Sequence, residues 1–498
     1  VLAGNLQATG GELDFTSGSG KITAYGTASD VNISVGTEKK ALIELTDTPD
    51  TPANEGTLNI KSGLIKLAGH GTSGSGSTLQ VEKGSVVLGD SVILTATDNT
   101  SGAGTLLVGS GASAELTLSK TTLDNYLKGT ATAPSGTNFT AASGSLNIGA
   151  SGTVVVNGDI KLSDYTFSGS AGAGLISGAS GAKFGADNLT VDANVANATG
   201  LTAIAKNNLT LGTNSANTVK AGIALESKNL TLVSNANNFV LQDNVTLKSI
   251  TKTTQEDKTV NVAAEGKING NAINVSGGSI TVGAGNYTFG EDITLTSGAL
   301  TVSANENADS QGANKVASSL KLTNGNIAIE RASGNGITVS GANATLDISE
   351  AGALTSNDTS SNSSGDVAII ANAGTLVLRG EQATSFIKKN TKASSIAIKS
   401  GGKVQVTDSL ELAFGTIKSG DTATNSAEAA LVFDSGSSGT LEVADTLTIN
   451  NFNTDALAIG QSGSIQAGTL ALVQSGGSTA TELKLGAGNF TVLNSLQA

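Results

Sequence analysis

Short runs of alternating apolar and polar residues recur along the whole chain, separated by turns of Gly, Ser and Asn. Two apolar residues one position apart point to the same side of a β-strand. Such pairs occur at Leu116/Leu118, Leu146/Ile148, Val154/Val156, Ile160/Leu162, Leu189/Val191, Leu209/Leu211, Leu230/Leu232, Val245/Leu247, Ile280/Val282, Leu300/Val302, Ile337/Val339, Leu346/Ile348, Leu376/Leu378, Ile396/Ile398, Leu441/Val443 and Leu447/Ile449. Because turns are frequent, the strands must be short, and a core of many short strands extends as a stack. The pattern predicts an elongated all-β protein.

Strands that begin with Asn show the repeat best. "NLTV" starts at Asn188, "NLTL" at Asn208 and Asn229, and "NVTL" at Asn244, so the first two intervals are nearly equal and the last is shorter. One coil of a parallel β-helix, with two or three strands, fits such a repeat. One coil cannot bury its apolar face alone, but stacked coils share a continuous core. We therefore expect a β-solenoid with about 20–24 residues per coil.

The organisation of the chain points to one array and not to several domains. Its 498 residues show no shift in composition that would mark a boundary, although this length usually makes three or four domains. We predict a single continuous β-solenoid over residues 1–498. Polar runs that break the period predict extruded loops near residues 46–56, 251–258, 305–314, 356–366 and 421–428. Each is either a tolerated insertion at a corner or a loop that contacts a receptor or a lattice neighbour.

Composition and charge exclude several partners. The net charge is −13 and only Arg331 and Arg379 are Arg, so nucleic acid is a poor partner. No stretch reaches the roughly 18 apolar residues of a membrane helix, so we expect no membrane insertion by this segment. There are no Cys, hence no disulfides. The chain starts at Val1 and contains no Met, which we interpret as a processed or excised segment whose export signal and anchor lie outside it.

The residues that enzymes need are sparse. His70 is the only histidine, so any Ser-His-Asp arrangement would depend on it, and its setting in "LAGHGTSG" is typical of an exposed turn. Glycosidases need paired carboxylates about 5–10 Å apart. Asp159, Asp187 and Asp292 are scattered along the chain and form no dense row. We therefore predict that the chain is not an enzyme and has no catalytic residues.

One calcium candidate remains. The segment "FGADNLTV" matches the tail of the nonapeptide calcium repeat, with Gly185, Asp187 and Leu189 in place. It lacks the leading Gly-Gly and does not recur at the interval of that repeat. We keep Asp187 as a calcium candidate and expect no other cofactor.

Repeated Asn-x-Thr triplets have two interpretations. Those at Asn188, Asn208, Asn229, Asn244, Asn286 and Asn489 fit the glycosylation pattern. They also fit an Asn at a coil corner, where stacked amides form hydrogen-bonded ladders. The chain further opens with "VLAGNLQA" and closes with "VLNSLQA". This match either places both ends at the same phase of the coil, so that end coils could pair, or is a coincidence of biased composition.

These features together resemble a family. The coils rich in Gly, Ser, Asn and Thr, the passage "GSLNIGASGTVVVNGDIKLSD" and the lack of Cys and Met resemble passenger regions of bacterial autotransporters. Exoproteins of two-partner secretion are similar, and surface-layer proteins share the acidic, Cys-free style. The resemblance implies a right-handed parallel β-helix, export through the outer membrane, and roles in adhesion or aggregation. It rests on style over nearly the whole chain and on no unique motif.

The leading expectation is a secreted or surface-displayed bacterial protein that acts in adhesion and self-association through its faces, loops or end coils. The alternative is a subunit of a self-assembling extracellular filament or surface-layer lattice. A carbohydrate-active β-helix enzyme is the third hypothesis, and it lacks site chemistry. Expected partners are other copies of the chain and a host or neighbouring cell surface. The expected location is extracellular, at the bacterial cell surface.

Overall fold

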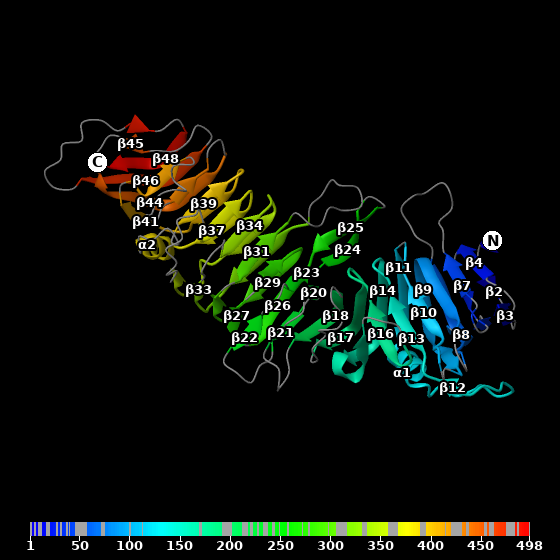
Figure 1. Ribbon diagram of the computed structural model, residues 1–498. Coiled ribbons are helices and arrows are strands. Elements are labelled where there is room, and N and C mark those ends of the chain that lie inside the picture. The colour runs from blue at the N-terminus through cyan, green and yellow to red at the C-terminus, as the bar shows by residue number, and fades with distance from the viewer. Residues whose placement is uncertain are drawn as a thin grey trace. The chain divides into compact units, whose positions relative to one another are not determined.

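The computed structural model is mostly β, with two α-helices among the residues that it describes (Figure 1). The described residues are 2–3, 6–7, 12–15, 20–25, 28–29, 32–35, 38, 40–44, 57–70, 75–98, 101–111, 113–168, 172–191, 202–211, 218–219, 223–226, 229–232, 238–241, 245–248, 250–255, 258–270, 272–276, 279–296, 298–304, 316–330, 336–356, 367–388, 395–413, 415–419, 431–434, 438–452, 456–457, 463–474, 484–485 and 488–497.

The chain divides into two compact units. Unit 1 comprises Val1–Ala216 and Lys220–Ser227, and unit 2 comprises Asn217–Val219 and Lys228–Ala498. The single array over residues 1–498 stays a prediction.

Unit 1 is built from parallel ladders. The first ladder contains β1 (Leu2–Ala3), β4 (Gly20–Tyr25), β7 (Lys40–Glu44), the start of β9 (Thr78–Thr97), β10 (Thr105–Val108), β13 (Ser145–Ile148) and β16 (Leu175–Gly178). The second contains β8 (Thr57–Ala68), the middle of β9, β11 (Ala114–Ser119), β14 (Gly152–Lys161), β17 (Lys183–Val191), β18 (Thr202–Leu211) and β20 (Ile223–Glu226). The third contains β3 (Glu12–Phe15), β6 (Asn32–Val35) and the ends of β8 and β9, and resumes with the ends of β14, β17 and β18.

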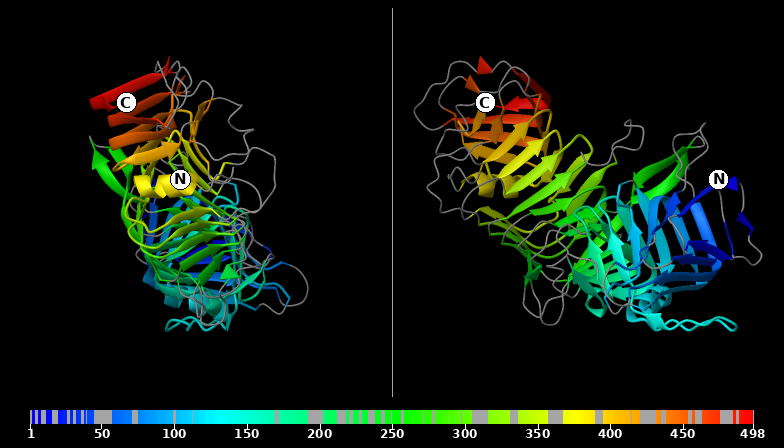
Figure 2. Two further views of the ribbon diagram at one scale, coloured as in Figure 1. Left: turned by 90° about the vertical axis from the view of Figure 1, so that its left-hand side faces the viewer. Right: turned by 45° about the vertical axis from the view of Figure 1, so that its right-hand side comes forward.

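Unit 2 repeats this arrangement (Figure 2). Its first ladder contains β21 (Asn229–Leu232), β26 (Glu265–Gly270), β29 (Gly285–Phe289), β32 (Ser318–Leu322), β35 (Ala344–Asp347), β38 (Thr375–Leu378), β40 (Lys403–Val406), and the starts of β44 (Thr440–Phe452), β46 (Ser464–Gln474) and β48 (Asn489–Gln497). Its second contains β23 (Val245–Lys248), β28 (Ser279–Val282), β31 (Ala299–Ser303), β34 (Ile337–Ser340), β37 (Ile369–Asn372), β39 (Ile396–Lys399) and β43 (Leu431–Phe433). Its third contains β19 (Thr218–Val219), β22 (Asn238–Leu241), β27 (Ala272–Val275), β30 (Ile293–Leu295), β33 (Ile327–Ile329) and β36 (Leu354–Ser356), and resumes with β41 (Leu410–Ala413) and the ends of β44, β46 and β48.

Smaller elements lie beside these ladders. They are the pairs β2 (Leu6–Gln7) with β5 (Ala28–Ser29) and β45 (Ala456–Leu457) with β47 (Lys484–Leu485), the strands β15 (Thr166–Ser168) beside β16 and β42 (Ile417–Ser419) beside β43, and the 3₁₀ turn η1 (Leu162–Asp164).

Aliphatic residues in register form the core of each unit. In the second ladder of unit 2, Ile280 pairs with Leu300, Leu300 with Ile337, and the column continues through buried Ile369, Ile396 and Leu431. Burying each such side chain stabilises the fold by roughly 1.5–3 kcal/mol. Where side chains are described, the apolar pairs predicted from the alternation face inward as expected; those of Leu209/Leu211, Leu230/Leu232 and Val245 lie outside the described side chains.

The interval between stacked strands is more variable than the sequence predicts. The step from Ile280 to its partner Leu300 has the expected length of one coil. The steps from Leu300 to Ile337 and from Leu106 to Leu146 are nearly twice as long. Inserted segments lengthen these intervals, so the predicted coil length describes only the shortest steps.

Of the predicted extruded loops, the one near 251–258 is resolved as a β-hairpin. Strands β24 (Ile250–Gln255) and β25 (Lys258–Ala263) pair antiparallel outside the large sheet (Figure 1). The predictions near 46–56, 305–314, 356–366 and 421–428 lie outside the described residues, apart from Ser356 at the end of β36.

Helix α1 (Lys120–Lys128), which the sequence analysis did not predict, stands where a strand would continue the third ladder of unit 1. It packs against β9 on one side and β14 on the other. The Tyr126 hydroxyl lies 2.8 Å from the carbonyl oxygen of Gly104 and 3.1 Å from that of Ser145, so its one proton is shared between two acceptors. Its pKa is raised because the ring is fully buried. The side chain of Tyr126 thus hydrogen-bonds to backbone carbonyls of neighbouring coils.

Helix α2 (Gly380–Lys388) was missed too, and it stands in the third ladder of unit 2 between β36 and β41. Buried Gln382 donates to the carbonyls of Ile348, Ala351 and Gly352 at 2.9 to 3.1 Å. Its side-chain carbonyl accepts the Arg379 N–H at 2.8 Å. One amide side chain therefore satisfies backbone groups both of the helix start and of the preceding coil.

Candidate functional site

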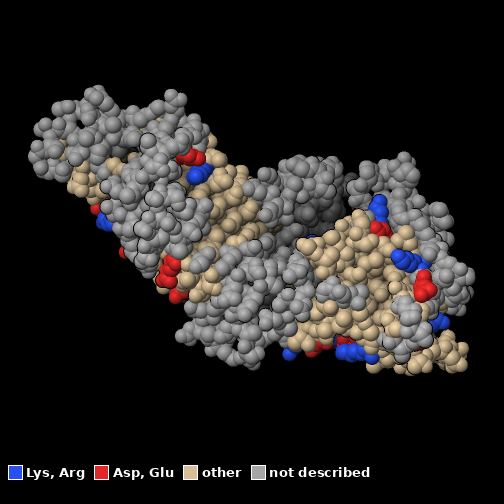
Figure 3. Space-filling model, in the orientation of Figure 1, with Lys and Arg blue, Asp and Glu red and all other residues tan. Residues whose placement is uncertain are grey.

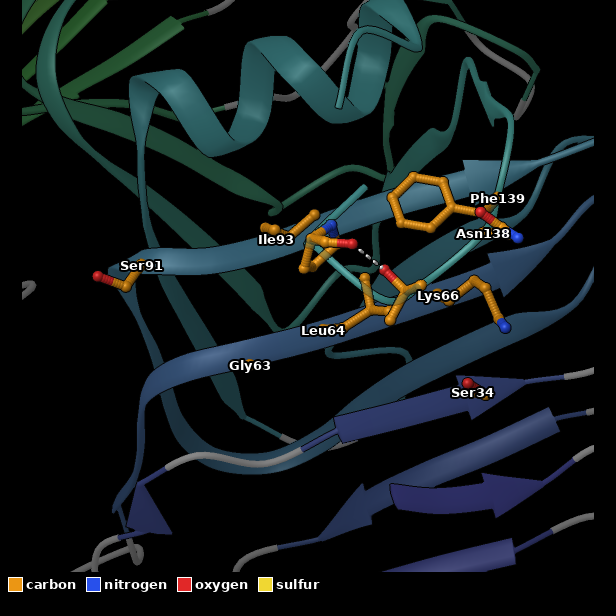
Figure 4. Close-up of a pocket in the computed structure, with 10 residues that line it drawn as sticks. Ser34, Gly63, Leu64, Lys66, Ser91, Ile93, Asn138 and Phe139 are labelled. Atoms are coloured by element: carbon orange, nitrogen blue, oxygen red, sulfur yellow. Dashed lines mark hydrogen bonds between the residues drawn. The ribbon is translucent and has the colours of Figure 1, made fainter. Parts of the chain in front are cut away.

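The candidate site is a pocket on the outer side of the third ladder in unit 1 (Figure 4). Its floor comes from three adjacent parallel strands, β6, β8 and β9. Leu64 pairs with Ile93, and Ser34 pairs with Lys66. The register places these side chains next to one another along the floor.

Two apolar residues of the floor break the alternating pattern. Ile65 and Leu94 point inward and are buried, at 1% exposure each. Their neighbours Leu64 and Ile93 must then face outward, because successive side chains of a strand alternate. Both are only half-buried. These two outward positions carry Leu and Ile, whereas other positions of β8 that face away from the core carry Asn59 and Lys61.

The wall of the pocket is the segment between α1 and β12 (Ala141–Ala142). Helix α1 ends at Gly129, whose φ of 65° is left-handed. A Cβ at Gly129 would lie 2.6 Å from the backbone carbon of Ala142, so only Gly fits. The chain then crosses the floor and returns as β12, which pairs antiparallel with the end of β9.

A turn shapes the middle of this wall. The Thr137 N–H and hydroxyl both donate to the Pro134 carbonyl, at 3.0 and 2.8 Å. Asn138 and half-buried Phe139 follow the turn, and Figure 4 shows them near the end of β9, with Leu64 and Ile93 toward the middle of the pocket. The helix that interrupts the ladder thus also produces the segment that closes the pocket.

The pocket has the size and mixed chemistry of a ligand site. Its volume is about 570 Å³, within the usual range of roughly 300–1,000 Å³. It is lined by Ser34, Gly63, Leu64, Lys66, Ser91, Ile93, Pro134, Thr137, Asn138 and Phe139. Lys66 is the only charged residue of the lining, and no carboxylate in the described part of the chain forms an ion pair with it.

The calcium candidate Asp187 has a structural contact. Its carboxylate accepts the backbone N–H of Gly158 at 2.7 Å, where the pairing of β14 with β17 shifts register. Within the described ranges, no three His, Cys, Asp or Glu side chains gather as a metal site. Calcium binding by Asp187 stays a prediction.

His70 lies in a bridge between turns. It pairs antiparallel with Gly102, and its Nε2 lies 3.4 Å from the Glu38 carboxylate. The prediction that the chain is not an enzyme is not tested by these contacts.

Outward polar residues connect neighbouring coils. The Asn188 amide donates to Asp159 at 2.7 Å, and the Asn286 amide donates to Glu265 at 3.1 Å while accepting from Ser319 at 2.9 Å. At these two positions the partners of the Asn amides are carboxylates and a hydroxyl, and the stacking of amide on amide stays a prediction. On the face drawn in Figure 3, most described surface residues are uncharged, and charged ones are scattered.

The sequence analysis missed the pocket, although two signals were present. "LI" at Leu64 and Ile65 and "VIL" at Val92 to Leu94 place consecutive apolar residues in strands that otherwise alternate. In the described residues, neither helix is long and apolar enough to cross a membrane.

Comparisons with protein-family models, curated proteins and solved structures find no match to this chain.

Proposed function

We propose that the chain is a bacterial β-solenoid, secreted or displayed at the cell surface, that acts as a structural and adhesive element. In this proposal both units are right-handed parallel β-helices. The observation that carries it is the in-register parallel stacking, in which aligned aliphatic columns such as Ile280, Leu300 and Ile337 recur through the ladders. Such stacking gives each coil backbone partners above and below and leaves long outer faces for contact.

The outer faces suit an adhesive role because they are held by hydrogen bonds between coils. Ladders such as Glu265, Asn286 and Ser319 fix the outward side chains relative to one another. A repeated array of preformed polar groups can bind a surface at low entropic cost. The hairpin β24–β25 and the pocket of unit 1 supply local contact features on this scaffold.

A second candidate is a subunit of a filament or a surface-layer lattice. β48 pairs with β46 on one side, and no other described strand pairs with it. Its residues Val492, Leu493 and Leu496 are 37%, 61% and 56% exposed.

Electron microscopy and analytical ultracentrifugation of the purified chain at micromolar concentration test both candidates. Elongated particles that bind bacterial or host cells when coupled to beads support the adhesive solenoid. Compact spherical particles, or beads that bind no cells, contradict it. Filaments or sheets that form with the native chain but not with the variant Leu493→Asp/Leu496→Asp move the filament subunit to first place.

Calcium enters the same measurement as one comparison. Assembly or binding that occurs only with calcium, and is lost in Asp187→Asn, supports the calcium prediction. Equal behaviour with and without the ion removes it.

A further inference from the structure

We infer that the pocket of unit 1 binds a short saccharide that carries a carboxylate. The inference rests on the proposed adhesive role only for its biological setting, because binding to the purified chain is measurable without it. The apolar floor of the pocket is not part of the core, because Leu64 and Ile93 lie on the outer side of the strands, opposite buried Ile65 and Leu94.

The charge of the pocket selects an anion. Among the described residues that line the pocket, Lys66 is the only charged one, and it lies beside Ser34 across the rung. The whole chain has a net charge of −13, so an isolated lysine without a described carboxylate partner is a local exception. A ligand carboxylate in hydrogen-bond reach of Lys66 would form a charge-assisted contact.

The remaining lining selects a ring with one apolar face and a polar rim. Leu64, Ile93 and Phe139 offer apolar and aromatic surface. The amide of Asn138, which is exposed, both donates and accepts, and the exposed Ser91 adds a hydroxyl. A sugar ring matches this division, because its C–H face packs on an aromatic side chain while its hydroxyl groups bind amides and hydroxyls.

A purely aliphatic carboxylate fits less well. An acyl chain would leave the amide and hydroxyl groups of the lining without partners from the ligand, which costs binding energy when they lose water. The pocket volume of about 570 Å³ also leaves room for more than one sugar ring. An acyl carboxylate shares the same anionic group and is therefore one arm of the test.

Isothermal titration calorimetry on the full chain tests the inference with three probes. They are a hexuronate trisaccharide, the same trisaccharide with its carboxylates methyl-esterified, and octanoate. We expect the free acid to bind and the ester to bind about tenfold or more weakly, as loss of a charge-assisted hydrogen bond predicts. Octanoate that binds while the saccharide does not overturns the saccharide assignment, and equal binding of acid and ester overturns the role of the carboxylate.

Matched variants locate the binding. Lys66→Met should weaken binding of the free-acid trisaccharide about tenfold or more. Lys61 is an exposed lysine on the same strand, outside the pocket, and Lys61→Met should leave this binding unchanged. Phe139→Ala should weaken acid and ester alike. Circular dichroism melting of each variant checks the fold. If Lys61→Met weakens binding as much as Lys66→Met does, the effect comes from general surface charge and the pocket is not the site. If folded, elongated particles bind no saccharide, the inference fails and the proposed solenoid is unaffected.

Discussion

Helix α1 in unit 1 and helix α2 in unit 2 each stand where a strand would continue the third ladder, and each contacts adjacent coils through a different polar side chain. In α1 the hydroxyl of Tyr126 reaches two backbone carbonyls of neighbouring turns. In α2 the amide of Gln382 reaches three. Each helix that takes the place of a rung thus directs one long polar side chain at backbone carbonyls of adjacent coils, outside the strands that it interrupts.

The helix starts differ as well. Ser119 precedes α1, and its hydroxyl accepts the Thr122 N–H at 3.1 Å, so the cap comes from the adjacent residue. Arg379 precedes α2 and cannot act in this way. There the Asp408 carboxylate, from the following coil, accepts the Gly380 N–H at 2.5 Å. The start of α1 is thus capped by an adjacent residue, whereas the start of α2 combines a local bond from the Arg379 N–H to Gln382 with one from the Gly380 N–H to Asp408 in the following coil.

The largest effect is expected from removing Tyr126. Tyr126→Ala should destabilise unit 1 by about 3–5 kcal/mol, because it leaves a cavity and removes both hydrogen bonds. Tyr126→Phe, which keeps the ring, should cost only about 1–2 kcal/mol. Denaturant unfolding followed by hydrogen-exchange mass spectrometry of the α1 segment measures both. Equal losses in the two variants would show that the hydroxyl, and not the ring, carries the effect.

The next effect concerns Gln382. Gln382→Ala should destabilise the α2 region by about 2–3 kcal/mol, since buried carbonyls lose their donor. Gln405→Ala, on the outer side of β40, serves as the control and should change stability by less than about 0.5 kcal/mol. Gln382→Glu should destabilise the α2 region more at pH 7 than at pH 4, because an ionised carboxylate would face the carbonyl oxygens at the higher pH. Unchanged exchange at residues 380–388 in Gln382→Ala would contradict the proposed role of the amide.

Alkaline pH should distinguish the two helices. Burial raises the pKa of Tyr126, and burial together with the Asp124 hydrogen bond raises that of Tyr165, which packs beside α1. Neutral tyrosine is therefore favoured by the folded state. Its contribution is complete below the unfolded pKa of about 10 and is lost as pH rises through the raised folded value.

We therefore expect unfolding around α1 above about pH 10, together with delayed tyrosinate absorbance. Helix α2 contains no tyrosine. When the stability of each protein is expressed relative to its own value at pH 7, Tyr126→Phe should unfold unit 1 at a higher pH than the native chain does. A transition that stays in place, or tyrosinate absorbance that rises at pH 10 while circular dichroism is constant, would show that burial of Tyr126 does not control it.

The alternating pairs predicted the inward columns of both units because the period of a strand is read directly from neighbouring residues. The helices were missed because each is a single short segment within a repeat of another kind. Their signal was present: Leu123, Tyr126 and Leu127 have the same i, i+3, i+4 spacing as Ala383, Phe386 and Ile387. Each helix is too short for that spacing to decide against strand neighbours.

The candidate site was beyond the sequence for a different reason. Apolar runs at Leu64 and Ile93 show that something covers the outer face, but they do not show what. Phe139 belongs to a segment whose path is fixed by the end of α1 at Gly129 and by its return as β12. Because the helix itself was not predicted, neither the wall nor the pocket could be. Asp187, the calcium candidate, accepts a backbone N–H at a register shift, and its binding of calcium stays a prediction.

The smallest effect should come from the caps, where the difference between the helices is one of distance along the chain. Ser119→Ala should destabilise α1 by about 1 kcal/mol, and Ser119→Asp should restore it, because a carboxylate also accepts the Thr122 N–H and favours the helix N-terminus. Synthetic peptides of residues 117–130 should show the same ranking, with less helix for Ser119→Ala than for the native sequence or Ser119→Asp, since the cap is local. Asp408→Ala should instead weaken α2 only in the folded chain, because its carboxylate reaches Gly380 from the next coil. A peptide of residues 377–390 lacks Asp408, so helicity in that peptide equal to that of the Ser119-capped peptide would show that α2 does not need its stack to begin.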